Sequence, residues 1–146
     1  MAECPLCAVA LGPVVAEGRH WRLILNHNLD LLGKCFLTLR RHIESITLVS
    51  AEEWTDLRGL VIEATRALEL AFAPDHFNYA FLQNQDRHVH LHVMPRYASI
   101  RTFGGAVFYD DTFPAHYAVG EPPRRLDDEQ TESLIELLRA SRTTGT

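Results

Sequence analysis

Hydrophobic and polar residues follow two different periods along this chain, and together they predict a mixed α and β fold. Four short segments combine large apolar residues with polar ones in the manner of strands. These segments are 19–26, 34–41, 76–83 and 88–95. Gly33 marks a turn between the first two, and the short interval 84–87 favours a hairpin between the last two. Pro95 is expected to end the fourth strand.

A long helix separates the two pairs of strands. Apolar residues recur at helical spacing over 51–73, which predicts one amphipathic helix. Ser50 followed by Glu53 matches a capping box at its start, and Pro74 ends it.

A second helix is predicted near the end of the chain, over 127–140, with a cap near Asp127. Its expected buried stripe consists of Leu134, Ile135, Leu137 and Leu138. Residues 97–125, rich in glycine and proline, are expected to be irregular. The order strand–strand–helix–strand–strand predicts an α+β fold with an antiparallel sheet.

Length, charge and cysteine content limit the class of protein. A chain of 146 residues is expected to form a single domain, 1–146. Its formal charge of −5 argues against a broad cationic surface for duplex nucleic acid. No apolar run approaches the roughly 20 residues of a membrane span. The N-terminus lacks the cationic region of a signal peptide, and three cysteines argue against a disulfide framework, so a cytoplasmic location is expected.

The fourth strand, "HVHLHVMPR", carries the main candidate chemistry. Because strand side chains alternate, His88, His90 and His92 are expected on one face, with the intervening aliphatic residues on the other. A merely solvated face is disfavoured, since imidazoles are poor solubilisers. Either these three histidines bind a metal, or one of them is a nucleophile while the others stabilise charge and transfer protons. Same-face neighbours lie about 7 Å apart, so all three histidines can hardly contact one metal or phosphate equally. They are therefore expected to have different roles.

A possible metal site begins in the N-terminal "CPLC". Cys4 and Cys7 have the C-x-x-C spacing of half a tetrahedral zinc site, and His42 and His88 are candidates for the other two ligands. Unliganded thiols are the alternative, and a redox pair is weaker because no thioredoxin-like context surrounds the motif. Cys35, in phase with apolar neighbours, is interpreted as an inert core thiol.

The histidine strand resembles the signature of the histidine triad (HIT) superfamily, in which three histidines alternate with apolar residues. Asn26 closing the first strand, Gly33 opening the second, and the "RH" junction before the long helix extend the resemblance, as does "NYAFLQNQ" before the triad. It covers about residues 3–97, leaving 98–146 as an extension. It implies an antiparallel sheet of about five strands with one long helix and a C-terminal helix, the sheet extended across a homodimer.

The resemblance also implies an activity. Such proteins are nucleotide hydrolases or nucleotidyl transferases that cleave at the α-phosphate of dinucleoside polyphosphates or nucleoside phosphoramidates, through a covalent nucleotidyl-histidine intermediate. By the motif, His90 is the nucleophile, His92 lies beside the phosphate and leaving group, and His88 supports the site. If protonated, His92 can donate a proton to the departing group. Asn26 is implied to contact the ribose, and Asn84 the phosphate or leaving group.

Zinc-bearing members of the superfamily imply a structural zinc ion held by Cys4, Cys7, His42 and His88. Gln85, three residues before the triad, occupies a position used for phosphate contact. Two arginines have two interpretations each. Arg87 is either a phosphate contact or a solvated residue, and Arg96 contacts either a distal phosphate or an acidic neighbour. Residues 101–117 are left as a lid, a dimer contact or a specificity element.

Three functions compete on the sequence. The leading one is the nucleotide hydrolase. The second is a zinc-stabilised nucleotide-binding module with little or no turnover. The third uses the histidine row itself as a catalytic metal centre, and it predicts activity that chelation destroys and metal restores.

Overall fold

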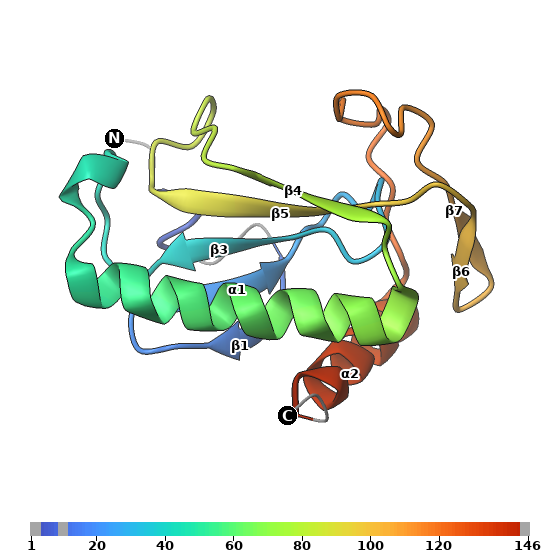
Figure 1. Ribbon diagram of the computed structural model, residues 1–146, viewed down its shortest axis with the longest axis horizontal. Helices are drawn as coiled ribbons and strands as arrows, with labels where there is room; N and C mark the ends of the chain where they lie inside the picture. The colour runs from blue at the N-terminus through green and yellow to red at the C-terminus, as the bar shows by residue number, and fades with distance from the viewer. Residues whose placement is uncertain (1–3, 9–11, 144–146) are drawn as a thin grey trace.

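The computed structural model describes residues 4–8 and 12–143 of the chain. Its main feature is an antiparallel sheet of five strands in the order β1-β2-β3-β5-β4 (Figure 1). The strands are β1 (Val14–Glu17), β2 (Trp21–Leu25), β3 (Cys35–Leu39), β4 (His76–Ala80) and β5 (His90–Arg96). The other elements are the 3₁₀ turn η1 (Ile46–Leu48), helices α1 (Ala51–Phe72) and α2 (Asp128–Thr143), and the strands β6 (Arg101–Phe103) and β7 (Ala106–Phe108). The expected α+β class and five-stranded sheet are confirmed.

Helix α1 covers one face of the sheet, and α2 packs against α1 and β1 (Figure 1). The core between α1 and the sheet is formed by alternate residues of β3 and β5 and by the apolar stripe of α1. Its members include Leu37, Leu39, Leu91, Val93, Leu57, Leu60, Ala64 and Leu68. The aliphatic half of the histidine strand therefore anchors β5 under the helix, which leaves His90 and His92 on the opposite face.

The start of α1 has the predicted capping box. The Ser50 hydroxyl accepts a hydrogen bond from the Glu53 amide at 3.2 Å, and the Glu53 carboxylate accepts one from the Ser50 amide at 2.8 Å. Glu53 also binds Arg41, at 2.8 and 2.9 Å. The Arg41 hydrogen bonds lower the pKa of Glu53 to about 2, despite its burial. The helix ends at Phe72, next to the left-handed Ala73.

The expectation that Pro95 ends the fourth strand is wrong. Strand β5 continues to Arg96, with Phe77 opposite Pro95. The ladder with β3 stops at the pair Cys35–Val93, so β5 has a single neighbour beyond that point. Proline is tolerated there because its missing N–H removes no bond from a β3 ladder.

The expected hairpin between the last two strands is confirmed, since β4 and β5 pair antiparallel, but its loop is longer than the predicted 84–87. Strand β4 ends at Ala80, which lies opposite His92, whereas β5 starts at His90 through its pairing with Thr38 of β3. The connection therefore spans residues 81–89 and includes His88. This longer loop matters for the site, since it holds three of the candidate residues, Asn84, Gln85 and His88.

The region 97–125 contains one regular element that the sequence reasoning missed. Strands β6 and β7 form a hairpin whose turn, Gly104–Gly105, has φ values of 57° and 82°. Two consecutive positive φ values are what a tight two-residue hairpin turn requires, and glycine adopts them without strain. The Gly-Gly dipeptide was the available signal.

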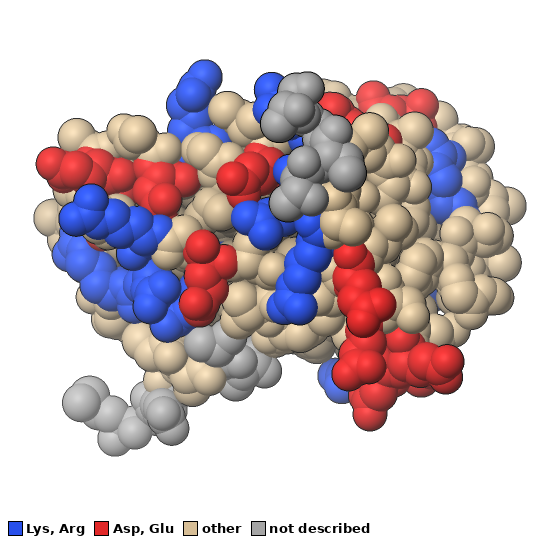
Figure 2. Space-filling model, turned by 90° about the horizontal axis from the view of Figure 1, so that it is seen from below, with Lys and Arg blue, Asp and Glu red and all other residues tan. Residues whose placement is uncertain are grey.

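The second predicted helix is confirmed, although it continues to Thr143 beyond the predicted end at 140, and one residue of its expected stripe is not buried. Asp127 caps it, accepting a hydrogen bond from the Gln130 amide at 2.7 Å. Leu134, Ile135 and Leu138 are buried, but Leu137 is 36% exposed. No helix among the described residues is long and apolar enough to span a bilayer. On the face shown in Figure 2, basic and acidic side chains are interspersed, without a continuous basic surface.

Candidate functional site

His88 lies just before β5 and is completely buried. Its Nε2 is 2.5 Å from the carbonyl oxygen of Leu39. A carbonyl only accepts, so Nε2 must carry the proton and Nδ1 keeps a lone pair. That lone pair faces Cys4 Sγ and Cys7 Sγ, both at 3.4 Å, and His42 Nδ1, at 3.1 Å. Burial lowers the pKa of His88, which favours the neutral form that a metal ligand needs.

The residues Cys4, Cys7, His42 and His88 form the one cluster of three or more candidate metal ligands within the part of the chain that the structure describes. Their ligand atoms lie within 4.8 Å of one another. A zinc ion with bonds of about 2.0–2.3 Å gives tetrahedral edges of about 3.3–3.8 Å. The two sulfur separations from His88, both 3.4 Å, lie in this range, and the His42 separation of 3.1 Å is slightly shorter. The donor set and its dimensions therefore suit a tetrahedral Cys₂His₂ site.

His90 is held in the opposite tautomer. Its Nδ1 lies 2.6 Å from the carbonyl oxygen of His88, so Nδ1 carries the proton and Nε2 carries the lone pair. Phe36, from the neighbouring strand β3, packs edge-on against the His90 ring with centroids 6.0 Å apart. The ring is thus fixed in position, with its unprotonated nitrogen available.

His92 lies beside His90, with ring centroids 4.8 Å apart. Burial, then the charges of His90 and Lys34, lower its pKa from 6.5 to about 4. In the absence of ligand, His92 is therefore neutral at pH 7. The protonated form considered for catalysis requires an anion in the site to raise this pKa.

Both histidines lie in a cavity of about 400 Å³. Three other predicted site residues line it too: Asn26 at the end of β2, and Asn84 and Gln85 in the loop 81–89. The Asn26 side-chain oxygen accepts a hydrogen bond from the Asn28 amide at 2.9 Å. Asn84 and Gln85 are exposed at the mouth. His88 does not line the cavity. Its contact with the site is the hydrogen bond that its backbone carbonyl accepts from His90 Nδ1.

Among the residues of the cavity wall that sequence reasoning missed, Lys34 and Tyr117 are joined by a hydrogen bond. The Lys34 ammonium donates to Asp30 at 2.6 Å and to the Tyr117 hydroxyl at 2.9 Å. Lys34 is the only lysine of the chain and directly follows Gly33, which was a usable signal. Tyr117 had none, because it comes from the segment 101–117, whose position follows from tertiary contacts.

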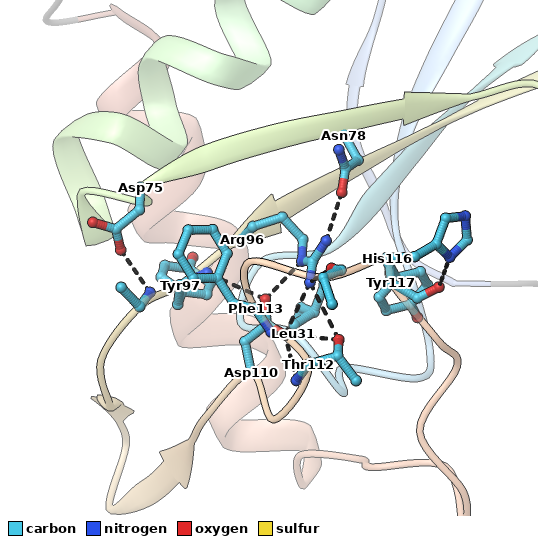
Figure 3. A network of polar contacts seen from close by, with 12 residues as sticks. Leu31, Asp75, Asn78, Arg96, Tyr97, Asp110, Thr112, Phe113, His116 and Tyr117 are labelled. Carbon is cyan, nitrogen blue, oxygen red and sulfur yellow. Dashed lines mark hydrogen bonds and ion pairs between the residues drawn. The ribbon is translucent and has the colours of Figure 1, made fainter.

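Those tertiary contacts centre on Arg96, at the end of β5 (Figure 3). Its guanidinium binds Asp110 at 2.6 Å, Asn78 at 2.7 Å and the Ala115 carbonyl at 2.8 Å. Of the two alternatives for Arg96, the structure therefore has the acidic neighbour. This network fastens the segment that carries Tyr117 to the strand that carries the histidines. Arg87 is exposed and does not line the cavity.

No family model matches the sequence, and no curated protein matches it. Solved structures do match. A histidine triad protein from Sinorhizobium meliloti aligns over 97% of this chain and 96% of its own, with a TM-score of 0.77 and 14% identity. A histidine triad protein from Bradyrhizobium japonicum aligns over 92% of each chain, with a TM-score of 0.73 and 17% identity. This chain has the histidine triad fold.

A third match bears on the metal cluster. A zinc-bound histidine triad family protein from Mycobacterium smegmatis aligns over 95% of this chain and 90% of its own, with a TM-score of 0.61 and 19% identity. The histidine triad fold thus occurs with bound zinc in that protein, and this chain has a cluster of suitable dimensions. At these identities the comparisons show the fold, and the chemistry must be argued from this chain's own residues.

Proposed function

We propose that this protein is a histidine triad nucleotide hydrolase or nucleotidyl transferase. It cleaves at the α-phosphate of dinucleoside polyphosphates or nucleoside phosphoramidates, with His90 as the nucleophile. One observation supports this most strongly: the His88 carbonyl fixes the tautomer of His90, leaving an unprotonated Nε2 on a residue that lines a cavity. An imidazole so held needs no reorientation before it attacks.

The reaction has two steps. Nε2 of His90 attacks the α-phosphorus, a P–N bond forms, and the bond from phosphorus to the leaving group breaks. The His88 carbonyl accepts a hydrogen bond from Nδ1 and so stabilises the positive charge that the ring acquires. Water then attacks phosphorus, the nucleoside monophosphate is released, and His90 is restored.

His92 is the proposed proton donor to the leaving group. Its low pKa in the ligand-free protein results mainly from burial. A bound phosphate is an anion that favours the charged imidazolium, so substrate binding itself brings the proton to His92. Asn26 is proposed to bind the ribose, and Asn84 and Gln85 the phosphate or leaving group, since all three line the same cavity.

We also propose that the Cys4–Cys7–His42–His88 cluster holds a structural zinc ion. Four protein ligands leave no position open for substrate, so the metal would stabilise the fold rather than take part in the reaction. The ion would fix His88, whose carbonyl orients His90. A homodimer with one continuous sheet is proposed as well, and β4, at the edge of the described sheet, is available to extend it.

The alternative is a zinc-stabilised nucleotide-binding module with little or no turnover. The neutral resting state of His92 favours it, because a site without a proton donor cleaves slowly. The two functions differ in what happens after binding. Only the enzyme forms a covalent adduct.

The test is a panel of dinucleoside polyphosphates and nucleoside phosphoramidates, with intact-mass detection of the protein after rapid acid quench. The enzyme should turn over at least one of them and gain the mass of one nucleotidyl group, which His90→Ala should abolish. Nucleotide binding with neither turnover nor adduct would establish the module. Failure to bind any nucleotide would contradict both.

A further inference from the structure

The sheet contains a buried hydroxyl that the proposed chemistry does not use. Thr38, on β3, is completely buried, and among the described residues its Oγ1 is the single buried side-chain nitrogen or oxygen without a hydrogen-bond partner. A buried hydroxyl without a partner destabilises the folded protein, whereas valine has the same shape and avoids that cost. An unpaired hydroxyl inside a well-packed sheet therefore needs a physical explanation.

Thr38 lies next to the proposed nucleophile. It is directly opposite His90 in the ladder between β3 and β5, so the two side chains share one face of the sheet. The Leu39 amide donates to the Val89 carbonyl at 3.2 Å, which makes the next pair along, Thr38 and His90, a non-hydrogen-bonded pair. In pairs of this kind the Cα atoms are only about 4.5 Å apart, and the side chains lie closest to each other.

The Thr38 hydroxyl has no direct access to a bound nucleotide. Phe36, the next residue of β3 on the same face, lines the cavity, whereas Thr38 does not. Phe36 also packs with Leu6 and Ile24 in a small apolar cluster on this face. The hydroxyl thus lies beside His90 in a water-excluded interior of low dielectric. Any effect that it has on the reaction must pass through the His90 ring.

The His90 ring gains a positive charge when its Nε2 bonds to phosphorus. The His88 carbonyl accepts a hydrogen bond from Nδ1 at 2.6 Å and stabilises part of this charge. A hydroxyl without a fixed partner rotates at little cost, so the Thr38 oxygen can turn towards a charge that appears beside it. Such a dipole stabilises the charged ring more than the neutral one, and low dielectric strengthens the effect.

We propose that Thr38 is a positioning residue that acts through His90, its hydroxyl oxygen turning towards the imidazolium that forms during attack on phosphorus. This inference rests on the proposed function. No bond forms or breaks at Thr38 and no proton leaves it, because only its hydroxyl dipole reorients. The hydroxyl therefore accelerates formation of the nucleotidyl-histidine intermediate and contributes nothing to nucleotide affinity.

The test uses two variants at this position. Thr38→Val removes the hydroxyl and keeps the shape of the side chain. With adenosine 5′-phosphoramidate, it should slow adduct formation in a single turnover by about three- to tenfold, the value of one neutral hydrogen bond. The Kd for AMP should stay within about twofold of that of the unmodified protein. Thr38→Ser keeps the hydroxyl and loses only the methyl group, so it should retain most of the rate.

Stability measurements separate this role from a structural one. Because Thr38→Val removes an unpaired buried hydroxyl, its Tm should equal or exceed that of the unmodified protein. A lower Tm would show that the hydroxyl has a structural partner, and it would overturn the assignment. Thr102→Val replaces an exposed threonine of strand β6 and is the matched control, which should leave the rate of adduct formation unchanged.

The outcomes also separate this inference from the function on which it rests. If the unmodified protein forms the adduct and Thr38→Val forms it at the same rate, the role of Thr38 is overturned and the proposed function stands. A serine variant as slow as the valine variant would assign the effect to the methyl group and would overturn the role too. If the unmodified protein neither binds AMP nor forms an adduct with any nucleotide tested, the proposed function itself fails.

Discussion

His88 and His90 are two residues apart, yet the fold prepares them for different partners. A backbone carbonyl accepts a hydrogen bond from the protonated Nε2 of His88, which leaves its Nδ1 facing two thiols and a second imidazole. Another carbonyl accepts a hydrogen bond from the protonated Nδ1 of His90, which leaves the lone pair of Nε2 for the cavity. The choice of carbonyl thus decides which nitrogen of a histidine is chemically active.

The surroundings of the two rings differ in the same sense. The cluster around His88 supplies four ligands and leaves no position open, as a permanent ion requires. The cavity beside His90 keeps unprotonated nitrogens and side-chain amides at its walls, as an exchangeable ligand requires. The proposed metal site and the proposed reactive site are therefore joined where the loop 81–89 enters β5, and each can be disturbed separately.

The sharpest way to separate the two sites is His90→Ala. Because it removes the nucleophile, we expect kcat to fall by about 10³-fold or more. The metal content and the melting temperature should stay close to those of the unmodified protein, since the cluster is intact. Elemental analysis and calorimetry on the same sample check this. Substantial residual turnover would contradict the role of His90.

The reverse experiment is the Cys4→Ser/Cys7→Ser double variant. It should bind no zinc, against about one ion per chain in the unmodified protein. Loss of a ligand held at about 1,000 times its Kd removes about 4 kcal/mol of stability, which lowers Tm by about 10 °C in a domain of this size. Turnover measured well below Tm should decrease much less than in His90→Ala. Chelator-sensitive activity with unchanged Tm would instead indicate a catalytic metal.

Arg96→Met tests the far end of the same strand. The Asp110 side chain is 2% exposed, and without Arg96 it becomes a buried unpaired charge, which costs about 3 kcal/mol or more. We expect a lower free energy of unfolding and looser attachment of the segment that places Tyr117 at the cavity, with zinc content unchanged. Denaturant unfolding measures the loss, and the Arg96→Met/Asp110→Asn double variant should regain part of it. A double variant no more stable than the single one would argue against this explanation.

The smallest expected effect is a dependence of stability on pH. His92 titrates near 6.5 when unfolded and near 4 in the folded protein. The unfolded chain therefore binds more protons between these values, so the contribution of His92 is complete above pH 6.5 and is lost as the pH falls towards 4. Relative to His92→Asn, the unmodified protein should lose at most about 1.4 kcal/mol per pH unit in this window. Parallel curves for the two proteins would contradict the low pKa.

The sequence predicted those parts of the molecule that local patterns determine. Periodicity located α1, and the Ser50–Glu53 pair located its cap. The alternation of apolar residues and histidines placed His90 and His92 on the other face of β5 from its aliphatic residues. The spacing of Cys4 and Cys7 indicated candidate metal ligands, and the fold brings them together with His42 and His88.

What could not be predicted depends on contacts between distant segments. Pro95 remains in a strand only because β3 ends earlier than β5, and no local rule contains that fact. Tyr117 reaches the cavity because Arg96 and Asp30 hold its segment there. The low pKa of His92 comes from burial, which the fold creates.

One carboxylate links the long helix to the metal cluster. Glu53 belongs to the first turn of α1, and it also binds Arg41, the residue before His42. Heating that frays this turn must free Arg41 and loosen the loop beside a metal ligand. We therefore expect α1 to melt and the proposed zinc ion to be released at the same temperature, as measured by calorimetry and by a zinc-sensitive dye on the same sample.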